Sequence, residues 1–155
     1  MSHEALITQF YQSFKKKDAE GMVACYHPEI QFQDPAFGKL QGADAGNMWR
    51  MLLSRKDNGL EMEFNNVKSS GNSGSANWKA TYLYGPDKRK VVNRIQANFE
   101  FKDGKIIKHV DEFDLWKWTR QALGWKGYLL GWTPFMRSKI HQQTNSLLRK
   151  FSANR

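Results

Sequence analysis

The sequence of 155 residues contains a single cysteine, Cys25. One thiol cannot form an internal disulfide, so we expect a reducing, cytoplasmic location. No uncharged apolar run approaches the about 18 residues that a membrane-spanning helix needs. The first ten residues, MSHEALITQF, include an acid and lack the apolar stretch of a signal peptide. We therefore expect neither a signal peptide nor a membrane-spanning helix.

Acidic residues are missing from the C-terminal segment. Residues 115–155 contain eight Lys and Arg and no Asp or Glu, which leaves 16 basic and 15 acidic residues in the rest of the chain. The net charge of +9 therefore belongs to a basic extension of a nearly neutral domain. Because the charge is modest and no recognition motif accompanies it, we expect no nucleic acid partner.

Large aromatic residues are abundant, with ten Phe, six Trp and five Tyr. A chain of this length and composition suits one domain with a buried core. We expect that domain in residues 1–116. Residues 117–155 should form a basic, aromatic-rich helical extension packed on it.

Hydrophobic periodicity predicts helices first and strands afterwards. Helical spacing covers residues 3–17 and roughly 43–55, and Asp18 can cap a short helix that His27-Pro28 closes. Alternation predicts strands at 30–34, 60–64, 76–84, 91–101 and 105–116, with 38–42 as a turn. Asp103-Gly104 indicates a tight hairpin. This order predicts an α+β fold with one curved antiparallel sheet.

Two of these strands direct carboxylates toward the apolar side. In IQFQDPAFG (30–38), Asp34 shares a face with Ile30 and Phe32. In the last strand, the more apolar face holds Ile107, His109, Asp111, Phe113 and Leu115. Burying an unpaired ionised carboxylate costs several kcal/mol. The pattern therefore favours a polar spot inside an apolar cavity.

The order of elements resembles the nuclear transport factor 2-like superfamily, which includes ketosteroid isomerase, limonene epoxide hydrolase, scytalone dehydratase and the SnoaL-like polyketide cyclases. The resemblance covers about residues 3–116, through KKDAEGMVACYHPEIQFQDP, the turn at Gly42 and HVDEFDLW. It implies a cone-shaped sheet wrapped on the N-terminal helices (a cystatin-like α+β barrel) around a pocket. It also implies a homodimer formed through the open sheet face.

The resemblance places Asp34 where the isomerase has its general base, and Asp111 where the epoxide hydrolase has one of its paired carboxylates. The remaining machinery of both enzymes is replaced. The tyrosine and second acid of the isomerase correspond to Phe10 and Ala97. The arginine and second acid of the hydrolase correspond to Trp78 and Ala80.

We therefore expect a cofactor-independent isomerase, cyclase, dehydratase or hydrolase. Asp34 would act as general base, and His109 or Asp111 would return a proton or hold the substrate oxygen. Two Asp and one His could also ligate a metal, but no ligand-spacing motif supports a metal site. An apolar cyclic ligand would contact Phe10, Phe14, Phe32, Trp49, Trp78, Tyr82, Ala97, Phe99 and Phe113.

Simpler interpretations exist for each feature. Asp34 could cap backbone N–H groups beside Pro35, and His109 and Asp111 could form a structural ion pair. The protein could then be a carrier of an apolar ligand or a dimeric interaction module. The extension could pack over the domain and cover the cavity, or it could contact a membrane surface through its basic residues and Trp116, Trp118, Trp125 and Trp132.

Overall fold

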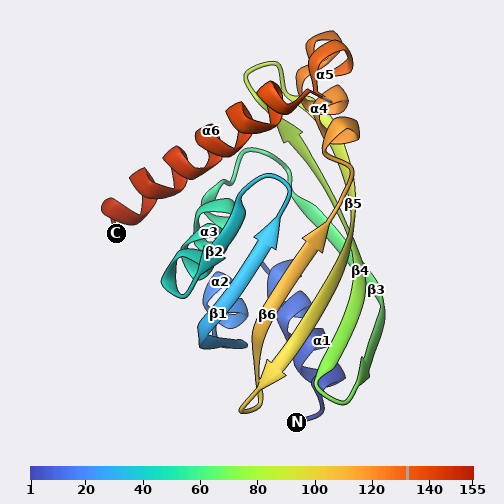
Figure 1. The fold of residues 1–155 in the computed structure, drawn as a ribbon, viewed down its shortest axis with the longest axis vertical. Coiled ribbons are helices and arrows are strands. Elements are labelled where there is room, and N and C mark those ends of the chain that lie inside the picture. Colours follow the sequence, from blue (N-terminus) through green and yellow to red (C-terminus); the bar gives the residue numbers. More distant parts are fainter. Residues whose placement is uncertain (132) are drawn as a thin grey trace.

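The protein's fold, in a computed structural model, is described for residues 1–131 and 133–155, so Trp132 lies outside the described residues. It combines helices with one curved sheet (Figure 1). The helices are α1 (His3–Lys15), α2 (Ala19–Val23), α3 (Ala43–Ser54), α4 (Leu115–Leu123), α5 (Trp125–Leu130) and α6 (Pro134–Ala153). The strands are β1 (Tyr26–Asp34), β2 (Gly38–Gln41), β3 (Glu61–Ser70), β4 (Ser73–Tyr84), β5 (Arg89–Lys102) and β6 (Lys105–Glu112).

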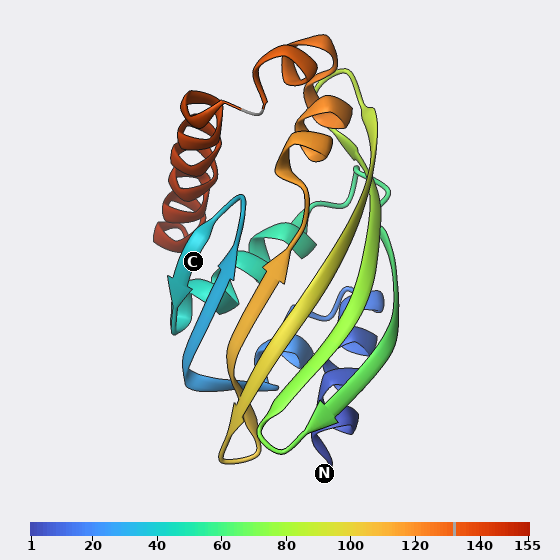
Figure 2. The same ribbon diagram turned by 45° about the vertical axis from the view of Figure 1, so that its right-hand side comes forward.

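The sheet has six strands in the order β2-β1-β6-β5-β4-β3 and does not close (Figure 2). Neighbouring strands are antiparallel except β1 and β6, which run parallel with Phe32 opposite His109. The sheet is therefore mixed, which corrects the prediction of a wholly antiparallel sheet. Local alternation predicts strands but carries no signal for this pairing of the first long strand with the last.

The N-terminal helices fill the concave side of the sheet. Ser2 caps α1, whose buried face consists of Leu6, Ile7, Phe10, Tyr11 and Phe14. This face packs against β3 and β4. The expected α+β architecture, in which a curved sheet wraps around these helices, is confirmed.

The segment predicted as a turn at 38–42 is largely the short strand β2. Leu40 is buried and lies opposite Phe32 on β1. Gly38 and Gly42 bound this strand with positive φ angles of 74° and 55°. Glycine adopts this backbone conformation without steric cost, so the two glycines turn the chain without preventing the strand between them.

The predicted facing of the last strand fails at its start. Ile106 is fully buried whereas Ile107 is only partly buried, because the β5–β6 register shifts between Glu100 and Phe101. Such a bulge exchanges the two faces of a strand locally. Beyond it His109 and Asp111 point inward as predicted. The hairpin itself turns at Asp103 and Gly104, both with positive φ.

The C-terminal extension packs on the domain in two places. Helix α4 lies against β5, and α6 lies against α3. Ile140 and Leu148 of α6 are buried. Phe135 is 75% exposed and Leu147 41%, so only part of the apolar face predicted for this helix is covered.

Candidate active site

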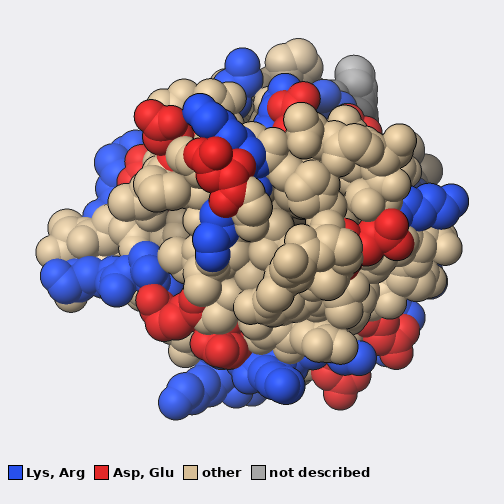
Figure 3. Space-filling model, turned by 90° about the horizontal axis from the view of Figure 1, so that it is seen from below, with Lys and Arg blue, Asp and Glu red and all other residues tan. Residues whose placement is uncertain are grey.

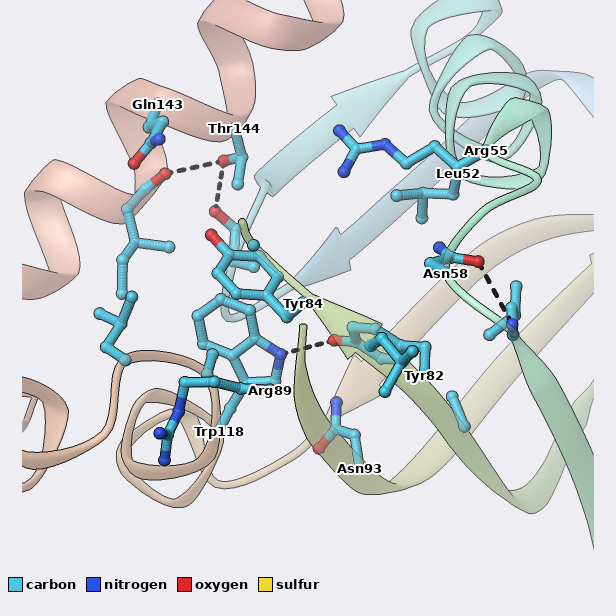
Figure 4. Close-up of a pocket in the computed structure, with 18 of the residues that line it drawn as sticks. Leu52, Arg55, Asn58, Tyr82, Tyr84, Arg89, Asn93, Trp118, Gln143 and Thr144 are labelled. Atoms are coloured by element: carbon cyan, nitrogen blue, oxygen red, sulfur yellow. Dashed lines mark hydrogen bonds between the residues drawn. The ribbon is translucent and has the colours of Figure 1, made fainter. Parts of the chain in front are cut away.

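A cavity of ≈ 950 Å³ lies between the inner face of the sheet, helix α3 and the C-terminal extension. Figure 4 shows Tyr82, Tyr84 and Asn93 entering it from the sheet, with Gln143 and Thr144 facing them from α6. This volume is in the range that holds a small organic ligand.

The structure separates the predicted ligand-binding residues into two layers. Seven predicted site residues line the cavity, namely Phe14, Asp34, Trp49, Trp78, Tyr82, Asp111 and Phe113. Five others are buried and are not part of the lining, namely Phe10, Phe32, Ala97, Phe99 and His109. The second group forms the core around the cavity.

Asp34 and Asp111 are neighbours on adjacent strands. Phe32 lies opposite His109 and Gln33 opposite Val110, so the next pair in this parallel register is Asp34 and Asp111. Residues at matched positions of paired strands point to the same face. Both carboxylates line the cavity. The two inward-facing acids predicted from separate strands therefore lie together.

Asp34 combines a structural role with an unusual titration. Its Oδ1 accepts hydrogen bonds from the backbone N–H groups of Ala36 (2.9 Å) and Phe37 (2.6 Å), so it caps the turn that follows β1. Burial raises its pKa from the ordinary 3.8 to about 7. The Phe37 and Ala36 hydrogen bonds oppose this rise, and the negative charge of Asp111 adds to it. The turn interpretation and a proton-transfer role are thus compatible.

Asp111 is held by one buried and one partly buried side chain. Its Oδ1 accepts a hydrogen bond from His109 Nε2 at 2.9 Å and another from Trp78 Nε1 at 3.3 Å. The Asp111 side chain is 3% exposed and that of His109 is 0% exposed. His109 is therefore buried beneath the cavity and hydrogen-bonded to Asp111, and it is not part of the cavity lining.

Tyr26 completes this buried network. Its hydroxyl lies 2.8 Å from His109 Nδ1 and accepts a hydrogen bond from Trp49 Nε1 at 2.9 Å. If Tyr26 donates to Nδ1 and Nε2 donates to Asp111, every one of these polar atoms has a partner with a neutral imidazole. Burial raises the pKa of Tyr26 well above 10. Sequence analysis missed Tyr26, because a single buried tyrosine on the start of a strand resembles any other core aromatic.

The upper part of the cavity contains Trp118 and Arg55, which sequence analysis also missed, beside the predicted Tyr82. Trp118 Nε1 on α4 donates to Tyr82 Oη at 2.6 Å. Burial raises the pKa of Tyr82 to about 12. Figure 4 shows Arg55 reaching over the cavity from the end of α3. These residues come from elements far apart in the chain, so no local motif connects them.

Metal ligands are not grouped in the part of the chain that the structure describes. Within residues 1–131 and 133–155, no three His, Cys, Asp or Glu side chains are arranged to hold a metal ion. In the same residues, no helix is long and apolar enough to cross a membrane.

Several solved structures share this fold at low sequence identity. An epoxide hydrolase of Mycobacterium tuberculosis resembling limonene epoxide hydrolase is 18% identical, with a TM-score of 0.64 over 82% of this chain and 94% of its own. A Pseudomonas putida KT2440 protein, provisionally named a polyketide cyclase, is 16% identical, with a TM-score of 0.66 over 79% and 98%. TerC, co-crystallised with polyporic acid, is 18% identical, with a TM-score of 0.59 over 71% and 89%.

These structures establish the fold and leave the reaction open. Among curated proteins, no sequence matches this chain. The model of the SnoaL-like domain matches residues 7–109, which is most of the chain and includes β1, the turn with Asp34, and β6 up to His109. The chain belongs to the SnoaL-like domain family.

Proposed function

We propose that the protein is a small-molecule enzyme of SnoaL-like type that applies acid–base chemistry, without a cofactor, to an apolar cyclic substrate. One observation carries the proposal: Asp34, with its pKa raised to about 7, lies beside Asp111 at the wall of an aromatic cavity. A general acid–base group works best when its pKa is near the working pH.

Asp34 would be the proton carrier. Its Oδ1 is occupied by two N–H groups, and no described residue is seen to donate to its Oδ2. At neutral pH both its protonation states are populated. Asp34 could take a proton from a carbon next to a carbonyl, or from a water molecule, and return the proton to the product. Asp111 would accept a hydrogen bond from the substrate or water, with His109 as a positioning residue.

The cavity suits an apolar ring system. Phe14, Trp49, Trp78 and Phe113 line the part that contains the carboxylates. Relatives of this fold named as an epoxide hydrolase and a polyketide cyclase, and the complex of TerC with polyporic acid, support a small-molecule substrate by analogy.

Two proton-transfer assays would test the proposal. One follows exchange of α-protons of cyclic ketones in D₂O by NMR, and the other follows hydrolysis of cyclic epoxides. Asp34→Asn keeps an oxygen for the cap but cannot carry the proton, so we expect at least about 100-fold slower turnover. Asp57→Asn, which changes an exposed acid of the same cavity lining, is the matched control. Activity that survives Asp34→Asn would contradict the proposal.

Transport of an apolar ligand is the second candidate, and the open cavity favours it over an interaction module, which would have a collapsed interior. A carrier would bind ring compounds equally well before and after Asp34→Asn. Titration of the intrinsic tryptophan fluorescence with such compounds would distinguish the two. If Asp34→Asn does not change ligand affinity, and neither protein turns the ligand over, the carrier is favoured.

We also infer a peripheral contact between the extension and an anionic membrane surface. Trp125, Tyr128, Leu130 and Phe135 are each about half exposed or more, at the end of the molecule where α5 lies. The surrounding residues 115–155 contain no acid. At the opposite end, basic and acidic side chains are interspersed (Figure 3). Absence of the protein from floated anionic vesicles would refute this contact. The homodimer stays a prediction.

A further inference from the structure

Helix α6 lies outside the residues that match the SnoaL-like domain, yet it is fixed to the domain along its length. Its buried side chains Ile140 and Leu148 anchor it. Near its C-terminus, Asn47 Nδ2 of α3 donates to Ser152 Oγ at 3.2 Å, and Arg155 donates to Asn47 Oδ1 at 2.6 Å. The helix is therefore attached to the domain before and after its middle turn, residues 141–145.

That middle turn meets the turn that follows β1. His141 Nε2 donates to the carbonyl of Pro35 at 2.7 Å, since a carbonyl can only accept. Thr144 Oγ1 has the carbonyl of Ala36 as its nearest acceptor at 2.9 Å, with the carbonyls of Ile140 (3.0 Å) and His141 (3.1 Å) in its own helix slightly farther away (Figure 4). Asn145 Nδ2 donates to the carbonyl of Phe37 at 3.0 Å. Residues spaced by three and four lie on one helix face, so three neighbouring side chains bind three consecutive carbonyls.

The turn is thus bound on both of its sides. Its carbonyl groups accept from α6, and its N–H groups at Ala36 and Phe37 donate to Asp34 Oδ1. The position of these two N–H groups decides how well the charged form of Asp34 is stabilised. A side chain of α6 can therefore act on Asp34 through the peptide units between them.

We infer that α6 is a clamp on the Asp34 turn, and that His141, Thr144 and Asn145 are positioning residues for this carboxylate. The catalytic role of this carboxylate rests on the proposed function, whereas the effect of α6 on its titration does not. The clamp adds a part to the site that the matched residues 7–109 do not contain.

Other titratable and charged groups around Asp34 would stay unchanged in a test of the clamp. They are Asp111 on β6, Tyr82 on β4, Arg55 at the end of α3, and Lys139 and His141 on α6. His141 is kept so that no titratable side chain is removed. The test variant is therefore Thr144→Val with Asn145→Leu, which removes two donors of the clamp and no charge.

The control variant is Ser138→Val with Gln142→Leu, which introduces the same two side chains at exposed positions of the same helix. Proteins with ¹³C-labelled aspartate would be titrated by NMR, and Asp34→Asn would assign the Asp34 signal. We expect the pKa of Asp34 to rise by about half a pH unit or more in the test variant, because weaker N–H donation stabilises the charged form less. The control should titrate like the unmodified protein.

An unchanged Asp34 titration in the test variant would overturn the clamp. A lowered pKa would also overturn it, because the helix would then act by excluding water. Thr144→Val alone is isosteric and serves if the double variant does not fold. This readout needs no turnover, so a shifted titration without any catalysis would retain the clamp and reject the proposed function.

Discussion

The two carboxylates lie side by side but are held in different ways. Asp111 receives its hydrogen bonds from the buried His109 and the partly buried Trp78, both within the residues that match the family. Asp34 receives its hydrogen bonds from backbone N–H groups of a turn that α6 holds from outside that domain. The first arrangement should be tied to the stability of the core. The arrangement around Asp34 should instead affect the pKa of this carboxylate. A change in the position of α6 would then change that pKa.

The largest effect should come from removing His109. His109→Leu leaves Asp111 buried without its closest donor and Tyr26 without its acceptor. Breaking a buried hydrogen-bonded pair costs about 3–5 kcal/mol, so urea unfolding should show a loss of that size. A double-mutant cycle with Asp111→Leu is the control, since the second substitution should cost much less once the partner is gone. Fully additive losses would mean that the two residues act independently.

Asp34→Asn should change the pH dependence of stability. The folded protein keeps the Asp34 proton up to about pH 7, whereas the unfolded chain releases it near the ordinary pKa of 3.8. The folded state therefore binds more protons between these values, and its free energy of unfolding falls as the pH rises through this window. The total is on the order of a few kcal/mol, from about 1.4 kcal/mol for each pH unit.

We expect Asp34→Asn to remove this fall, so that its stability relative to the unmodified protein increases from pH 4 to pH 7. Urea unfolding at several pH values measures the difference, with Asp57→Asn as the control. A difference that is constant across this window would show that Asp34 titrates normally in the folded protein.

A smaller difference in stability is expected between two variants in which a buried tyrosine is replaced by phenylalanine. Tyr26→Phe removes a hydroxyl that bonds His109 and Trp49, and should cost about 1–2 kcal/mol. The Tyr11 hydroxyl is also buried but has no hydrogen-bond partner among the described residues. Tyr11→Phe should therefore be neutral or raise the thermal unfolding temperature. Equal losses in both variants would show that the Tyr26 network adds no net stability.

Local patterns in the sequence predicted much of the fold. Helical spacing located α1 and α3, and alternation located β3 to β6. The short strand β2 was missed because three residues between two glycines look like a turn. The parallel pairing of β1 with β6 was missed because it depends on how the chain crosses over, which alternation does not encode.

The candidate site was predictable where it follows from strand facing. Alternation alone directed Asp34, His109 and Asp111 inward, and the structure places the two acids at one cavity. Alternation predicts which face of a strand a residue lies on. It does not predict whether the side chain reaches the cavity or is buried beneath it, as His109 is. The contacts of Thr144 and Asn145 with the turn were equally hidden, because polar residues on a helix usually face water.

The bond between Asn145 and Phe37 joins residues 108 positions apart. Loops of this length close late, since the entropy lost on closure is recovered only after the intervening elements have folded. During synthesis on the ribosome, the turn after Asp34 is made well before Asn145, 108 positions after Phe37, can reach it, so the turn first exists without its outer support. Until α6 is in place, the N–H groups of this turn would donate less well to Asp34, and the acid would hold its proton more tightly than in the complete fold.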